Sequence, residues 1–188
     1  MNRVILILLA IGTLLFTSFN MLGQKRNSRD LKIVELFTSQ GCSSCPAADR
    51  LLSEIADNDN IIALSFHVSY WNYLGWKDPY SSKQFTERQR EYARKMMLQS
   101  IYTPQIVING TSEFVGSNKS RLASEISNDS DDSIFHKIII NTLSTDNGTL
   151  KVDYSIPNLK GDLKLNVAIV ERHVENYVPK GENRGRNL

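Results

Sequence analysis

The first two-thirds of the chain alternates short apolar runs with longer amphipathic stretches. Four runs have the length and the β-branched or aromatic content of buried strands: 31–37, 61–66, 105–108 and 112–115. Three further stretches carry apolar residues at helical spacing: 42–55, 81–97 and 117–127. The dipeptide Asn109-Gly110 favours a tight turn between the last two strands. The predicted order is β-α-β-α-β-β-α, which indicates an α/β domain over residues 28–128.

Beyond residue 128 the hydrophobic period changes from helical spacing to alternation. A polar, acidic stretch at 128–133 predicts a linker. Three segments in which apolar and polar residues alternate then predict an antiparallel β-rich segment over 134–188: 135–143, 150–156 and 163–169. Such a sheet needs a covering layer. The polar residues 179–188 do not supply one, so the segment is expected to be incomplete.

The N-terminus has the pattern of an export signal. Arg3 precedes an almost unbroken apolar stretch, 4–16, and polar residues follow it. The stretch is shorter than the roughly 20 apolar residues of a membrane span, so residues 1–23 are predicted to be a secretory signal peptide. An uncleaved anchor is the alternative, because no clean pair of small residues marks a cleavage site. Either way, the rest of the chain is expected to be exported, periplasmic or extracellular, where disulfides persist.

Composition and charge exclude several classes of partner. The chain has 188 residues, of which 41% are hydrophobic, and this is enough for one good core. Its formal net charge is only +2, and the basic residues are scattered among acidic ones. Phosphate backbones require a concentrated basic surface, so no nucleic acid partner is predicted. No stable membrane partner is predicted either, beyond the alternative of an N-terminal anchor.

The candidate chemistry is concentrated in the only two cysteines, Cys42 and Cys45, where the first strand gives way to the first helix. A Cys-x-x-Cys pair in this position is typical of dithiol redox sites. Backbone amides at the helix start favour the thiolate of Cys42, which makes it the predicted nucleophile. Cys45, expected inside the helix and shielded from solvent, is the predicted resolving thiol. Ser43 and Ser44 are placed to donate hydrogen bonds to sulfur.

Two other interpretations of the cysteine pair stay open. The first is a permanent, inert disulfide, although so short a loop gains little stability from closure. The second is a metal site, for which the two thiolates would have to recruit His67 and a further group. The redox interpretation needs no metal or other cofactor, and none is predicted.

Two further features are consistent with a redox site. Thr103-Pro104 opens a strand just before a hairpin, where a cis peptide bond would present the backbone of Thr103 to a substrate cysteine. An ordinary trans proline is the alternative. Glu35 interrupts an apolar strand, and a carboxyl group buried near the dithiol would take the proton of Cys45 during resolution. Alternatively, Glu35 points outward or pairs with a lysine. Thr103, Pro104 and Glu35 are therefore candidate catalytic residues.

An aromatic loop, residues 67–80, follows the second strand. It contains both tryptophans and three of the seven tyrosines of the chain. Aromatic side chains offer large contact areas and lose little conformational entropy on binding, so His67, Tyr70, Trp71 and Trp76 are predicted to bind a substrate or partner. The alternative is that the loop packs into a small core of its own.

Several segments together resemble a known family: Val34–Leu52 around the cysteines, Phe66–Pro79, Tyr102–Gln105 and, more weakly, Gly181–Arg186. They are similar to the secreted thioredoxin-like proteins catalogued as domain of unknown function 1223. The resemblance implies export and a thioredoxin-like three-layer α/β/α domain with a helical and aromatic insertion, followed by the small antiparallel β segment. It implies no particular substrate.

The chain departs from the family pattern in three respects. Ala47 stands where a second proline is usual, Ser69 stands where an acid is usual, and family members continue with further strands past the late motif. The leading hypothesis is an exported thiol-disulfide oxidoreductase that acts on protein or small-molecule thiols and disulfides. The alternative is a non-enzymatic module that binds a ligand or a metal through the cysteine pair, His67 and the aromatic loop.

Overall fold

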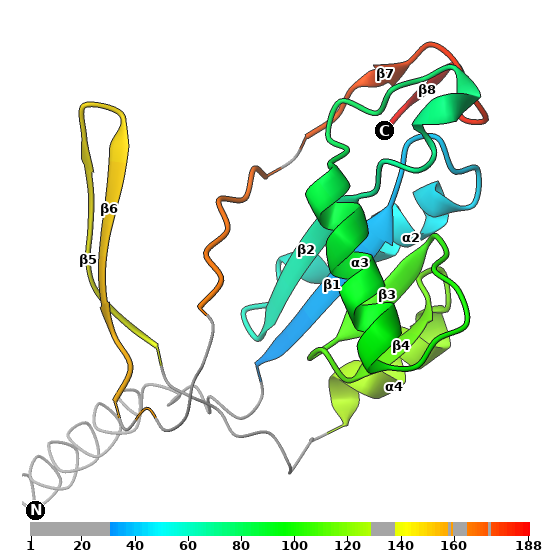
Figure 1. Ribbon diagram of the computed structural model, residues 1–188. Coiled ribbons are helices and arrows are strands. Elements are labelled where there is room, and N and C mark those ends of the chain that lie inside the picture. Colours follow the sequence, from blue (N-terminus) through cyan, green and yellow to red (C-terminus); the bar gives the residue numbers. More distant parts are fainter. Residues whose placement is uncertain (1–30, 129–137, 158, 160–164, 173) are drawn as a thin grey trace, which may run out of the picture. The chain divides into compact units, whose positions relative to one another are not determined.

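A computed structural model describes residues 31–128, 138–157, 159, 165–172 and 174–188. The predicted signal peptide, residues 1–23, and residues 129–133 of the predicted linker lie outside the described residues. Among the described residues, no helix is long and apolar enough to cross a bilayer. This part of the chain forms a mixed α/β structure, with a central mixed sheet and three α-helices (Figure 1).

The central sheet has four strands in the order β2-β1-β3-β4. They are β1 (Lys32–Thr38), β2 (Ile61–His67), β3 (Gln105–Ile108) and β4 (Ser112–Val115). β2 runs parallel to β1, whereas β3 is antiparallel to β1 and forms a hairpin with β4. This hairpin turns at Asn109-Gly110, where both residues have positive φ as an Asn-Gly turn favours. All four strands lie within one residue of their predicted bounds.

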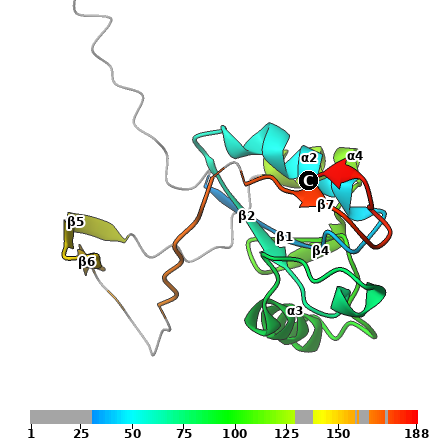
Figure 2. The ribbon, with the colours of Figure 1, turned by 90° about the horizontal axis from the view of Figure 1, so that it is seen from above.

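Helices cover both faces of the sheet. α2 (Cys45–Ala56) and α4 (Lys119–Ser127) lie on one face, and α3 (Lys83–Lys95) lies on the other (Figure 2). Alternation along β1 explains the layers, because successive side chains of a strand point to opposite faces. Leu36 packs in the core under α2 and α4, while its neighbour Phe37 packs toward α3, and both are fully buried.

The C-terminal part of the chain contains two separate hairpins. β5 (Ile139–Asp146) and β6 (Thr149–Ser155) pair and turn at the predicted Asn147-Gly148, and their apolar side chains are exposed. The predicted third strand is not found: residues 165–169 are not in a strand, and 163–164 lie outside the described residues. Instead, β7 (Tyr177–Val178) and β8 (Arg186–Asn187) form a short hairpin where the sequence indicates only a polar tail.

Candidate redox site

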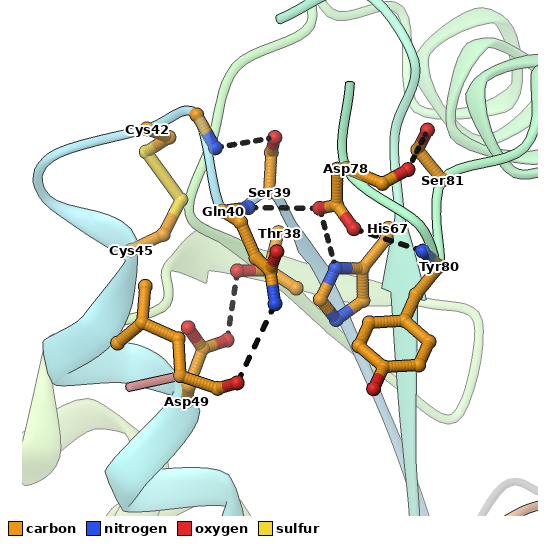
Figure 3. Close-up of polar contacts among 12 residues, drawn as sticks. Thr38, Ser39, Gln40, Cys42, Cys45, Asp49, His67, Asp78, Tyr80 and Ser81 are labelled. Carbon is orange, nitrogen blue, oxygen red and sulfur yellow. Dashed lines mark hydrogen bonds and ion pairs between the residues drawn. A yellow bond between two sulfur atoms is a disulfide. The ribbon is translucent and has the colours of Figure 1, made fainter. Parts of the chain in front are cut away.

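The two cysteines are joined in a disulfide at the junction of β1 and α2 (Figure 3). α2 begins at Cys45 rather than at Cys42, so Cys42 lies in the preceding turn and Ser44 is the N-cap residue. Pro46 stands in the first helical turn, where its missing N–H costs little. Only 1% of Cys42 and 0% of Cys45 is exposed. The shielding predicted for Cys45 therefore extends to both sulfurs.

One of the predicted hydroxyl contacts with sulfur is present. The Sγ of Cys42 lies 3.4 Å from the Oγ of Ser44. The backbone amides of the turn are partly engaged by oxygen: the N–H of Ser43 donates to a carboxylate oxygen of Glu182 at 2.9 Å, and the N–H of Cys45 donates to the carbonyl of Cys42 at 3.2 Å. The bare amides expected at the start of the helix are thus already hydrogen-bonded at these two positions.

Gly41 lets the aromatic loop approach the turn that carries the cysteines. A Cβ at this position would lie 3.0 Å from the Cβ of Trp71 and 3.3 Å from its carbonyl oxygen, closer than most side chains tolerate. The indole N–H of Trp71 in turn donates to the hydroxyl of Thr103 at 2.7 Å. Trp71 therefore connects the cysteine turn to Thr103.

The peptide bond between Thr103 and Pro104 is cis, as predicted. Pro104 is buried near α2, and Gly116 lies in close contact with both. A Cβ on Gly116 would lie 3.1 Å from the Cβ of Pro104 and 3.0 Å from that of Ala48. Ala48 follows Cys45 by three residues on the same helix, so the two lie on one face of it. The Thr103-Pro104 turn therefore neighbours the helix that begins with Cys45.

Asp49 is a half-buried acid that the sequence analysis did not single out. It follows Cys45 by four residues on α2, so the two side chains lie on the same helix face (Figure 3). The hydroxyl of Thr38 donates to its carboxylate at 2.7 Å. Burial of the carboxyl group raises the pKa of Asp49 to about 6, although the bond from Thr38 and the charge of His67 lower it. A half-buried carboxyl group one helical turn from Cys45 thus has a pKa well above its ordinary value.

His67 is bound to Asp78 and not to the cysteines. Its Nδ1 lies 2.7 Å from a carboxylate oxygen of Asp78, which also accepts the backbone N–H of Gln40 at 2.8 Å. Burial alone would raise the pKa of Asp78, but the hydrogen bond from His67, its electrostatic attraction and the backbone N–H groups of Gln40 and Tyr80 hold that pKa below its ordinary value. Through the bond from the N–H of Gln40, Asp78 ties the aromatic loop to the turn before Cys42.

The other predicted binding residues of the aromatic loop also make contacts within the protein. The indole N–H of Trp76 donates to the side-chain oxygen of Gln40 at 3.1 Å, and the hydroxyl of Tyr70 donates to Gln89 at 3.2 Å. Tyr70, Trp71 and Trp76 are all half-buried. The loop therefore packs against the cysteine turn and the core beside α3 rather than into a core of its own. The predicted contact of these residues with a substrate stays a prediction.

Glu35 is buried on the α3 side of the sheet. Both its carboxylate oxygens accept from the guanidinium group of Arg88, at 2.5 and 2.8 Å, and the hydroxyl of Tyr92 donates to it at 2.6 Å. This is the pairing alternative, with an arginine in place of the lysine. Because α2 lies on the opposite face, Asp49 is closer in position to Cys45 than Glu35 is, and the role of Glu35 as the proton acceptor has no contact to support it.

The hairpin of β7 and β8 lies against the cysteine turn, and we call residues 176–188 the C-terminal clasp. Asn183 is fully buried, and its amide nitrogen donates to the carbonyl oxygens of Gln40 at 2.9 Å and of Cys42 at 2.8 Å. The amide group of Asn176 pairs with the side chain of Gln40, at 2.5 and 3.3 Å. The hydrogen bond from Ser43 lowers the pKa of Glu182. Sequence reasoning missed these contacts, for which the motif Gly181–Arg186 was the one signal.

The described residues contain no group of three or more His, Cys, Asp or Glu side chains arranged to hold a metal ion. The metal alternative required His67 beside the cysteines, and in the structure the Nδ1 of that side chain is engaged by Asp78. No observation on the described residues therefore favours the metal-binding module.

The fold and the site together define a class: an α/β protein with a disulfide-bonded Cys-x-x-Cys pair between a sheet strand and a helix. The chain belongs to the family DUF1223, described as a protein of unknown function, whose family model matches residues 33–188. It is similar to a crystal structure of protein AGR_C_4864 from Agrobacterium tumefaciens, with 35% identity over 65% of this chain and a TM-score of 0.56. The match spans 55% of that protein's length. No curated protein matches the chain significantly.

Proposed function

We propose that the protein is an exported thiol-disulfide oxidoreductase with a thioredoxin-like domain at about residues 28–128, acting in the periplasm or outside the cell. One observation carries the proposal: the Cys42–Cys45 disulfide lies at the start of α2, and this helix packs against the cis Thr103-Pro104 turn. An inert bridge would not require a half-buried acid one helical turn from Cys45, because the desolvation of an ionised carboxyl group costs stability.

The reaction exchanges one disulfide for another, and its electrons balance without a cofactor. In the reduced protein, the thiolate of Cys42 attacks a partner disulfide, forms a mixed disulfide and releases one partner thiolate, which takes up a proton. The thiolate of Cys45 then attacks the sulfur of Cys42, releases the second partner thiolate and closes the Cys42–Cys45 disulfide. The partner is thereby reduced by two electrons and the protein is oxidised. The reverse sequence oxidises a partner dithiol.

Asp49 has the position and the acidity to take the proton from Cys45. Resolution requires the Cys45 thiolate, and a base with a pKa near the working pH accepts such a proton most effectively. Burial raises the pKa of Asp49 to about 6, which is close to that optimum. In this proposal Glu35 has a structural role in its pair with Arg88. Asp49 then has the catalytic role that the sequence analysis predicted for Glu35.

Thr103 and the aromatic loop complete the proposed partner site. The backbone of Thr103, before the cis proline, is proposed to pair with the backbone of the partner next to its cysteine. Trp71 holds Thr103 through its indole N–H and lies against Gly41, so it fixes the spacing between this backbone and the cysteine turn.

Cysteine variants test the proposal directly. Cys42→Ala is expected to abolish the reduction of insulin disulfides with dithiothreitol as electron donor, because the attacking thiolate is lost. Cys45→Ala is the matched control, because it is expected to accumulate a mixed disulfide at Cys42 that mass spectrometry detects. Unchanged turnover in Cys42→Ala would exclude this mechanism.

The reduction potential separates a redox site from an inert bridge. Active dithiol pairs have potentials between about −270 and −120 mV, whereas structural disulfides of secreted proteins lie below about −300 mV. The wild-type pair is expected in the first range when it is equilibrated with glutathione or dithiothreitol redox buffers. A value below about −300 mV, together with no turnover, would identify a structural bridge.

A further inference from the structure

We propose that the C-terminal clasp occupies the surface on which a polypeptide partner binds, and that the partner reaches Cys42 only after the clasp opens. The inference rests on the proposed oxidoreductase function and adds the substrate class, which is a cysteine within a polypeptide. It concerns a motif, Gly181–Arg186, that the reaction itself does not use.

The clasp lies against the turn that carries a solvent-shielded disulfide. Both cysteines are at most 1% exposed, whereas Ser43 and Ser44 between them are exposed. The clasp hairpin lies at the same end of the domain as the start of α2 in both ribbon views (Figures 1 and 2). Its buried contact with the cysteine turn is made by one side chain, Asn183, which binds the carbonyl of Cys42 itself. A sulfur that is this well covered cannot be attacked in line by a second sulfur.

The groups that the clasp contacts are those that a peptide backbone would contact. The turn offers two carbonyl oxygens, of Gln40 and Cys42, and one N–H, of Ser43. Asn183 supplies the donor N–H groups and Glu182 supplies the acceptor oxygen. An extended polypeptide carries the same donors and acceptors along its main chain. A small thiol carries no such set, so the exposed turn would favour a polypeptide partner.

The contacts that the clasp makes with the cysteine turn are hydrogen bonds, which suits an element that opens. Only Val178 and Asn183 of its residues are buried. The remaining contacts to the cysteine turn are hydrogen bonds of Asn176, Glu182 and Leu188, and water can replace them when the clasp opens. The apparent affinity for a partner is then reduced by the fraction of molecules with an open clasp.

Asn183→Asp tests the proposal in the full chain. The variant has the same shape, but carboxylate oxygens would face the two carbonyl oxygens that the amide nitrogen now binds, so the clasp opens more often. We expect kcat/KM for insulin reduction to rise about tenfold or more. kcat/KM for hydroxyethyl disulfide, a small substrate that needs the same opening, is expected to rise by a similar factor and to stay below the value for insulin, because it cannot use the hydrogen-bonding groups of the turn. Arg184→Ala is the control, because Arg184 is an exposed residue of the same clasp and is expected to leave both values unchanged.

Three outcomes overturn the inference. The first is an Asn183→Asp variant, folded by circular dichroism, that matches the Arg184→Ala control with insulin. The second is a kcat/KM for hydroxyethyl disulfide in Asn183→Asp that equals or exceeds the value for insulin, which would contradict a polypeptide partner. The third comes from the wild-type chain and needs no variant: the amide of Ser43, which is bound to Glu182 when the clasp is closed, exchanges its hydrogen as fast as an unstructured amide. The reduction potential of the wild-type pair decides the proposed function separately, because an equilibrium value does not depend on access.

Discussion

At the scale of single residues, the surroundings of two acids, Glu35 and Asp49, decide which of them is available to accept a proton near the cysteines. Glu35 and Asp49 are both acids on elements that flank the cysteines, but they lie on opposite sides of the sheet. Glu35 is neutralised by Arg88, whereas Asp49 receives a hydrogen bond from Thr38 and no arginine or lysine salt bridge among the described contacts. Since desolvation of the ionised Asp49 opposes folding, its place one helical turn from Cys45 is better explained by the proposed proton transfer than by stability.

Asp49→Asn is expected to stabilise the oxidised protein in a pH-dependent way. The pKa of Asp49 is about 6 in the folded state and about 3.8 in an unfolded chain, so the folded state binds an extra proton between these values. The free energy of unfolding of the wild type therefore falls, relative to the variant, as pH rises from about 4 to 6. At pH 7 the variant is expected to be more stable by up to about 3 kcal/mol, and the difference is expected to vanish below about pH 4.

Urea unfolding curves of both proteins between pH 3.5 and 7.5 measure this difference. The asparagine keeps an oxygen that accepts the hydrogen bond from Thr38, so the comparison isolates the charge. A difference that is constant over this pH range would show that Asp49 is not a half-buried, titrating group. If Asp49 accepts the proton of Cys45, the same variant also lengthens the lifetime of the mixed disulfide at Cys42.

At the scale of elements, hydrophobic spacing predicted the sheet and its helices because those elements bury apolar side chains. β1 to β4 agree with the runs of Val, Ile, Leu and Phe to within a residue, and α2 agrees except for its first turn. The clasp escaped prediction because β7 and β8 have two residues each and are held by Asn and Gln side chains, which leave no periodic pattern. The sequence likewise did not predict Asp49 and Asp78 as residues of the site, since their burial depends on segments that are distant in the sequence.

Gly116→Ala is expected to destabilise the contact between the Pro104 turn and α2. The added Cβ would lie 2.9 Å from Leu36, 3.0 Å from Ala48 and 3.1 Å from Pro104, so a strand, a helix and the cis turn would all have to shift. Overpacking of this kind costs about 1–3 kcal/mol. Urea unfolding measures the cost, and Ser117→Ala, at an exposed neighbouring position, is the control. A loss no larger than that of the control would mean that these elements are not tightly packed.

At the scale of the whole molecule, stability is expected to be unevenly distributed. The strands β1 and β3 are buried at the centre of the sheet, whereas the described side chains of β5 and β6 are almost all exposed. An isolated two-stranded hairpin is marginal in water, because it buries little apolar surface. The exposed Ile140, Leu143 and Tyr154 give this hairpin no core of its own.

Hydrogen exchange followed by mass spectrometry is expected to separate the two regions. Amides of β1 and β3 should exchange only through global unfolding, and amides of β5 and β6 should exchange orders of magnitude faster. The central strands serve as the internal reference in the same sample. Protection of β5 and β6 equal to that of β1 would contradict this picture and would show that another surface covers the hairpin.

The bond from Asn183 to Cys42 joins residues 141 positions apart. A ribosome needs roughly 10 to 30 s to synthesise that length. Throughout this interval the nascent chain carries both thiols, but Asn183, whose side chain later binds the carbonyl oxygen of Cys42, has not yet been synthesised. Under the proposed export, an oxidising enzyme that meets the chain before the clasp forms would therefore find an accessible dithiol, whereas both cysteines are shielded from solvent in the folded protein.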